Sequence, residues 1–363
     1  MANGFKQRYY KIQKWTLDCE VITPMFLGNA EQKAQWRAEP FKSSMRYWWR
    51  VASGSKKSDF KDLHSSESAL FGSAGGDNGE GGGKSKVSVA VSSLVNPAPP
   101  AKLQGDVPLH HPETTKPVGC LSYLAGQGLM ISGTVKKTFF EAKSQFELQV
   151  NSSGSVAKDF ESALSLMQAF GAVGARSRNA WGCFRVNGGG INNDSVMNTL
   201  TSCTIDWKQS MNLDYPNSLG KDDKGPLIWI TVNKRTSWQE TMKDIAEAYI
   251  QLRSGTTKNG ILKLDPDNGE RHLLGIFQSK SHDTIGGTKL GNNRYASPLR
   301  LMVRKTVDHY FGLFLHVPCM FNFPIDKPVI KLAEQIDIWE TKIHRKLDNM
   351  SDKLRRASYG ECL

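Results

Sequence analysis

The chain has 363 residues, enough for two domains of ordinary size that bury their cores without disulfides or metal. It carries 47 Lys and Arg against 35 Asp and Glu, a formal net charge of +12, and residues 1–50 hold nine basic and four acidic side chains while residues 251–300 hold eight and four. No stretch approaches the ~18 apolar residues that cross a bilayer, and the six cysteines form no CxxC pair, which argues against a membrane span, a zinc site and a disulfide framework. We expect a cytoplasmic protein with no cofactor or metal, whose charge serves either nucleic-acid binding or solubility alone.

The first half of the chain has the periodicities of alternating strands and helices. Apolar and polar residues alternate in the strands, and apolar residues recur every three or four positions in the helices. In chain order the predicted elements are a strand at 15–22, a helix at 42–53, a glycine-rich surface insertion near 72–86, a strand at 86–94, a strand-rich region at 129–150, a helix at 160–170 and a strand at 182–186. This order is that of a ferredoxin-like domain enlarged by insertions.

The second half offers a shorter version of the same order. Its predicted elements are strands at 227–232, 297–303 and 310–317 and helices at 238–252 and 336–347. The polar, glycine-containing stretch 187–202 separates the halves. The prediction is therefore an α+β protein with two ferredoxin-like (RRM-like) domains, at residues 1–200 and 201–363. That one half duplicates the other is a hypothesis from element order alone.

The segment Lys42–Arg50, KSSMRYWWR, is a candidate anion site. It places two hydroxyls, at Ser43 and Ser44, and unpaired backbone N–H groups at an expected helix start. Arg46 and Arg50 follow one turn apart, so their guanidinium groups could bind adjacent phosphates. The same pattern is also compatible with an ordinary capped helix, with the tryptophans in the core and the arginines in solvent.

A second candidate is the loop from Phe170 to Gly182, FGAVGARSRNAWG. Its glycines allow the backbone to approach a ligand closely, and Arg176 and Arg178, two positions apart in an extended loop, point the same way. Trp181 offers a plane on which a base could stack. The alternative is a tight connection between helix and strand whose arginines only face water.

These residues resemble the RAMP superfamily of CRISPR proteins, and within it the family of the first subunit of the type III-B, or Cmr, effector complex. The resemblance covers most of the chain. It depends on ITPMFLG at 22–28 followed by Gln32, RYWWR at 46–50, LFGS at 70–73, the glycine-arginine loop at 174–182 and YASPL at 295–299. The chain departs from the family pattern at Ser43-Ser44, where a small residue or glycine is expected after the lysine.

The resemblance implies a non-catalytic subunit that binds CRISPR guide RNA, and target RNA through it, beside other RAMP subunits of an antiviral effector complex. Target cleavage would belong to another subunit. The residues expected to hold RNA are Lys42, Ser43, Ser44, Arg46, Arg50, Arg176, Arg178, Trp181 and Arg294. Arg46 and Arg176 are expected to face the same RNA strand, as two walls of one groove.

Two other functions stay open at this point. The chain could be a metal-independent endoribonuclease that matures guide RNA, with His110 or His111 transferring protons, although adjacent residues of an extended segment point to opposite sides. It could also be a protein-contacting adaptor that uses Trp36, Trp48 and the apolar segment 310–317 as contact surface.

Overall fold

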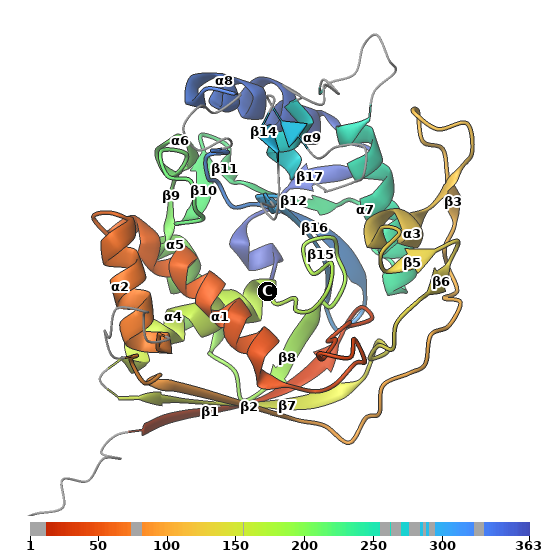
Figure 1. Ribbon diagram of the computed structural model, residues 1–363. Helices are drawn as coiled ribbons and strands as arrows, with labels where there is room; N and C mark the ends of the chain where they lie inside the picture. Colours follow the sequence, from red (N-terminus) through yellow and green to blue (C-terminus); the bar gives the residue numbers. More distant parts are fainter. Residues whose placement is uncertain are drawn as a thin grey trace, which may run out of the picture.

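The structure is a computed structural model that describes residues 12–73, 82–154, 156–254, 262, 270–275, 284–285, 288–289, 295–322 and 330–363. It is built around two four-stranded antiparallel sheets with helices packed against them (Figure 1). This mixture confirms the expected α+β class. No helix of these described ranges is long and apolar enough to cross a membrane.

The first sheet contains, in spatial order, β2 (Val87–Ser92), β7 (Gln145–Ser153), β1 (Ile12–Val21) and β8 (Phe184–Gly188). All neighbouring strands are antiparallel. Helical connections follow the first and third of these strands in the chain, namely α1 (Ala38–Ser53) with α2 (Phe60–Phe71), and α4 (Ala157–Phe170). This is the strand order of a split β-α-β unit.

Burial explains why these strands form a layer. Side chains of β1 and β7 alternate between buried and exposed. One face of the sheet is therefore exposed to solvent, and the other packs against α1 and α4. Phe41 of α1 touches the rings of Phe146 and Phe184 on the sheet, with centroids 5.3 and 5.9 Å away. Trp48 of α1 meets Phe170 of α4 at 5.5 Å. Aromatic packing therefore sets the position of α1.

The second sheet contains β15 (Leu299–Lys305), β16 (Tyr310–His316), β12 (Ile228–Thr231) and β17 (Leu354–Arg356), again with antiparallel neighbours. The connections are α7 (Trp238–Arg253) and the run α8 (Leu332–Asp337), a π-helical segment (Ile338–His344) and α9 (Arg345–Asn349). When the four strands of each sheet are numbered by their order in the chain, both sheets have the same spatial order, 2-3-1-4. Both faces of β15 and β16 are buried, so this sheet lies inside the molecule.

The remaining elements lie between and beside the two sheets. The stretch between β2 and β7 holds β3 (Pro108–Leu109), β4 (Val118–Gly119), α3 (Cys120–Ala125), β5 (Met130–Ile131) and β6 (Thr134–Val135). The shorter elements of the second half are α5 (Asn193–Ser202), β9 (Thr204–Asp206), α6 (Trp207–Ser210), β10 (Leu219–Asp222), β11 (Gly225–Pro226), the 3-10 turn Glu270–Leu274, β13 (Thr284–Ile285) and β14 (Thr288–Lys289). Tyr123 of α3 meets Tyr249 of α7 at 6.3 Å, so the first insertion packs against the second half.

Two expectations concerned the segments between the predicted elements. The polar stretch expected to separate the halves instead forms α5. The Asn192 side chain caps this helix by accepting a hydrogen bond from Ser195 N, and the side chains of Val196 and Leu200 are buried. The division at residue 200 falls inside this helix and stays a prediction. The glycine-rich insertion does lie between a helix and a strand, as expected, although its middle part, residues 74–81, is outside the described residues.

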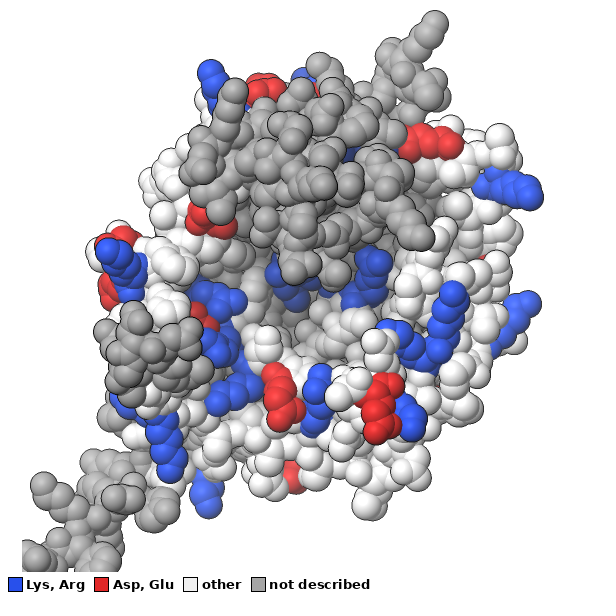
Figure 2. All heavy atoms as spheres, in the orientation of Figure 1, with Lys and Arg blue, Asp and Glu red and all other residues white. Residues whose placement is uncertain are grey.

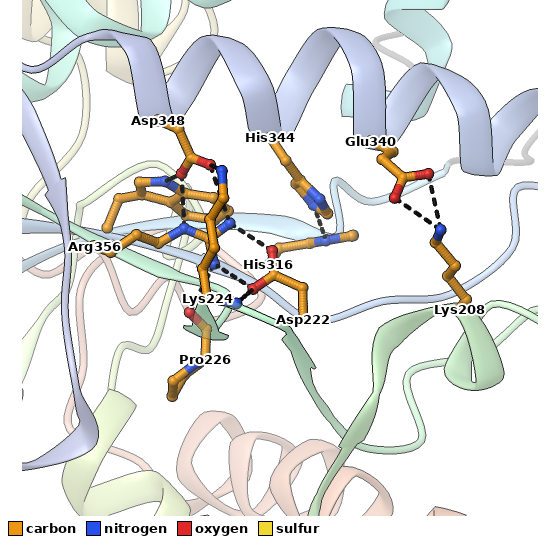
Figure 3. A network of polar contacts seen from close by, with 10 residues as sticks. Lys208, Asp222, Lys224, Pro226, His316, Glu340, His344, Asp348 and Arg356 are labelled. Atoms are coloured by element: carbon orange, nitrogen blue, oxygen red, sulfur yellow. Dashed lines mark hydrogen bonds and ion pairs between the residues drawn. The ribbon is translucent and has the colours of Figure 1, made fainter.

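A buried polar network supports the second sheet (Figure 3). Asp348 of α9 accepts from Trp229 Nε1 at 2.7 Å and from Arg356 Nε at 2.7 Å, joining helix and sheet. Beside it, His316 of β16 and His344 of the π-helical segment are joined at 2.9 Å. Burial, and after it neighbouring positive or protonated groups, lowers the pKa of both histidines well below the usual range. Both imidazoles are therefore neutral at pH 7.

Candidate nucleic-acid interface

Helix α1 begins at Ala38, four residues before the expected start at Lys42. Pro40 lies in the first turn, where a helix tolerates proline because the first backbone N–H groups have no partner inside the helix. Ser43 and Ser44 consequently lie in the second turn, so the expectation of a helix start with unpaired backbone N–H groups at these residues is wrong. Arg37, in extended conformation, precedes the helix instead.

Arg46 and Arg50 do point to one side of α1, and both reach the same carboxylate. Arg46 Nε and Arg50 Nη1 each lie 2.7 Å from Glu67 Oε1 of α2, and only 6% of the Glu67 side chain is exposed. The arginine side chains are 39% and 31% exposed. Their charge is therefore partly neutralised inside the protein. Lys42 lies nearby and donates to Ser85 Oγ at 2.9 Å; burial, and then the charge of Arg46, lowers its pKa.

The glycine-arginine loop is strained and closely packed. Gly174, Arg176, Ala180 and Gly182 all have positive φ, at 90°, 59°, 67° and 64°. A Cβ at Gly174 would lie 2.6 Å from the Phe26 carbonyl oxygen, so only glycine fits there. A non-glycine residue in the left-handed backbone region costs conformational energy. Such residues concentrate where a functional site requires a particular backbone conformation. The strain therefore supports a functional interpretation of this loop.

The loop also joins the two halves. Ala180 N donates to Leu301 O at 2.8 Å and Leu301 N donates to Arg178 O at 2.9 Å, forming a short parallel bridge to β15. The Arg178 side chain donates from Nη1 to Ser297 O at 2.7 Å, within the YASPL segment. Two segments that carry the family resemblance, far apart in the chain, are thus in direct contact.

Trp181 requires a correction. Its side chain is fully buried, with its ring edge against Phe26 at 5.5 Å and Trp238 at 6.0 Å. It therefore anchors the loop in the core and presents no plane to a base. Arg176 also differs from expectation, because its guanidinium lies against Gly126 at the end of α3. Arg294 lies outside the described residues.

A cavity of about 380 Å³ separates α1 from the loop. Its lining residues are Pro40, Ser43, Ser44, Tyr47 and Arg50 of α1, Ala172, Val173, Gly174, Ser177 and Arg178 of the loop, and Arg300 of β15. Neither Arg46 nor Arg176 is among them. The two predicted segments do lie on opposite sides of one cavity, and its cations are Arg50, Arg178 and Arg300.

A second cavity, of about 330 Å³, shares Pro40 and Gly174 with the first. It adds Arg37 and Lys137, together with Gly28 and Gln32 of the ITPMFLG motif region. The two cavities form one run along the loop, which we call the basic groove. Figure 2 shows Lys and Arg side chains around a hollow in the middle of this face. Such a run of cations suits a polyanionic strand.

Sequence reasoning missed three cations of the groove, Arg37 and Lys137 of the second cavity and Arg300 of the first. Arg300 had a signal in the sequence. It lies in the basic window 251–300, from which Arg294 was chosen. The available signal was the strand LRLMVRK, in which two arginines interrupt an otherwise apolar run at positions of the same face.

Most of the residues behind the two alternative functions are buried, while His110 is exposed and Trp36 is half-buried. His111 is 8% exposed, its Nδ1 accepts from Glu113 N at 3.3 Å and its Nε2 lies 3.1 Å from Ser254 Oγ. Burial lowers its pKa, and both ring nitrogens have structural partners. Trp48 and the whole of β16 are buried, so they offer no contact surface to a partner protein.

Residues 18–185 match the family model of the RAMP superfamily. A crystal structure of Cmr1 from Pyrococcus furiosus in the apo form is 18% identical, with 91% of this chain and 97% of that chain covered and a TM-score of 0.47. A type III-B Cmr-beta complex bound to cognate target RNA contains a chain 10% identical, with coverages of 85% and 94% and a TM-score of 0.44. No curated protein matches the sequence.

Proposed function

We propose that this chain is a non-catalytic subunit of a type III-B CRISPR effector complex that holds guide RNA in the basic groove. The observation that carries the proposal is a groove lined by Arg37, Arg50, Lys137, Arg178 and Arg300 inside a chain of net charge +12. The match to the RAMP superfamily model and the motif resemblance supply the biological setting. In this proposal both halves are ferredoxin-like, and the other partners are target RNA and neighbouring RAMP subunits in antiviral defence.

The groove favours recognition of charge and shape over sequence. In its first cavity the polar groups are cationic side chains, serine hydroxyls and the Tyr47 hydroxyl, which suit phosphate and sugar oxygens, and the second cavity adds Asn29, Gln32 and Thr138. Sequence would then be recognised by the guide RNA itself through base pairing. The proposed role is therefore positioning of the guide strand, without proton transfer by the protein.

The test is binding of a guide-length single-stranded RNA to the full chain, measured by fluorescence anisotropy at several salt concentrations. The variant carrying both Arg50→Ala and Arg178→Ala should bind about 10- to 100-fold more weakly, because each charge-assisted contact contributes about 1.5–3 kcal/mol and Arg50 is already shared with Glu67. The salt slope should fall by about 1.4, about 0.7 for each lost phosphate contact.

The matched control removes two exposed lysines, Lys158 and Lys221, which lie on α4 and β10 away from the groove lining. It has the same net charge as the double arginine variant. Unchanged affinity and slope in the arginine variant, or an equal loss in the lysine variant, would show that overall charge rather than the groove binds RNA.

A further inference from the structure

Strand β15 carries two buried arginines on one face, and they differ in their partners. Arg300 is 4% exposed and Arg304 is 7% exposed. Arg304 donates from Nη1 to Phe184 O at 3.1 Å and from Nη2 to Gln168 O at 3.0 Å, which joins the second sheet to the first half. Arg304 is thus a satisfied structural residue.

Arg300 has a different environment. Its guanidinium carbon lies 4.8 Å from the Tyr47 ring centroid and 5.0 Å from that of Trp48, so it is stacked on α1. Its Nε is buried without a hydrogen-bond partner, and the side chain lines the first cavity of the groove. Within the described part of the chain no carboxylate forms an ion pair with Arg300. It is a buried cation that faces a cavity.

The neighbourhood adds a second cation. Arg178 lies 5.2 Å from the same Tyr47 ring and donates to a neutral carbonyl, Ser297 O. Burial is the main cause that lowers the pKa of Arg300. Tyr47 raises this pKa in part, and the charge of Arg178 lowers it further. An arginine keeps its proton even so. A buried cation with no ion pair among the described residues, with a second cation beside the same small cavity, is unfavourable unless an anion completes the site.

We propose that this cavity is a seat for one phosphate group of the RNA strand, with Arg300 of the second half as its buried anchor and Arg178 as its second cation. The hydroxyls of Ser43 and Ser44 face the same space. A volume of about 380 Å³ is at the small end of ligand sites, which suits one nucleotide unit. Because the cavity continues into the second one past Pro40 and Gly174, the seat takes an internal phosphodiester of a continuing strand.

The first experiment tests the anion seat without RNA. Thermal unfolding of the full chain is followed in inorganic phosphate and in chloride of equal ionic strength, for the natural chain and for Arg300→Met and Arg304→Met. Phosphate should raise the melting temperature of the natural chain and of Arg304→Met, but not of Arg300→Met. In chloride Arg300→Met should melt no lower than the natural chain, because it removes an unpaired buried charge. Equal phosphate shifts in all three chains would overturn the seat.

The second experiment rests on the proposed function and uses a short single-stranded RNA. Arg300→Met should weaken binding about 10- to 100-fold and Arg300→Lys less, because lysine keeps the charge but loses the fork geometry. Arg304→Met should bind within about twofold of the natural chain. If the natural chain shows the phosphate shift but binds no RNA, the proposed function fails while the seat stands. If it binds RNA and Arg300→Met binds equally well, the seat is not on the RNA path.

A third arm identifies the source of the phosphate. The same RNA is compared with a hydroxyl and with a phosphate at its 3′ end, and then at its 5′ end. Equal affinities support an internal phosphodiester. Tighter binding of one phosphorylated end, lost in Arg300→Met, would place a chain end in the seat and overturn the internal assignment.

Discussion

Glu67 forms ion pairs with Arg46 and Arg50, which leaves less of their charge for RNA. Removing the Glu67 charge should therefore lower the stability of the fold and strengthen RNA binding. In Glu67→Gln the acceptor keeps its shape but loses its charge. A charge-assisted hydrogen bond contributes about 1.5–3 kcal/mol, whereas exposed ion pairs contribute about 0–1. Since both arginine side chains are about one third exposed, the contribution of each hydrogen bond to stability should lie between these two ranges. We expect the free energy of unfolding to fall by about 1–2 kcal/mol.

The same change leaves two arginines free of their carboxylate, and Arg50 already lines the groove. RNA affinity at low salt should therefore rise about 3- to 10-fold, with a salt slope steeper by about 0.7 for each new phosphate contact. Urea unfolding measures the first effect and fluorescence anisotropy the second. The control is Glu340→Gln, which removes an exposed pair with Lys208 and should change neither quantity. Lower stability with unchanged or weaker RNA binding would refute the idea that Glu67 limits the groove's charge.

Two further predictions concern the fold. Because the pKa values of His316 and His344 are lowered in the folded chain, the unfolded chain binds more protons below its histidine pKa of about 6.5. The free energy of unfolding should thus be level above about pH 6.5 and fall below it by up to about 1.4 kcal/mol per pH unit for each histidine; a level urea midpoint from pH 7.5 to 5.5 would contradict this. Gly182→Ala should destabilise by about 2–3 kcal/mol, since its methyl group meets the Val173 carbonyl oxygen at positive φ. Gly225→Ala, also at positive φ but in open space, should cost less, and equal urea midpoints for the two variants would exclude the clash.

Periodicity predicted most of the regular elements because burial in this chain follows the simple alternations. The strand expected at 15–22, the helix at 160–170 and the helix at 238–252 correspond to β1, α4 and α7 with ends within three residues. The expected start of α1 at Lys42 was four residues late, because the first turn of a helix accepts a proline such as Pro40. The helix α5 was missed because only Val196 and Leu200 mark its buried side.

The candidate site was located correctly at the level of segments and wrongly for several side chains. Sequence alone indicates that an arginine is available, but not whether a carboxylate such as Glu67 already binds it. It also cannot tell that Trp181 turns inward, because an indole in a glycine-rich loop suits a core anchor as well as a stacking plane. Arg300 depends on the docking of β15 against α1, a contact between residues about 250 positions apart that no local pattern reveals.

The bridge between the glycine-arginine loop and β15 has a consequence for synthesis of the protein. The first sheet is complete once residue 188 has been made, and N-terminal units generally fold first as a chain leaves the ribosome. At that stage Leu301 and Arg300 do not exist, so the loop has no strand to pair with and the seat has no anchor. A partly made chain would therefore carry an unfinished groove, and capture of RNA would begin only when nearly the whole polypeptide is present.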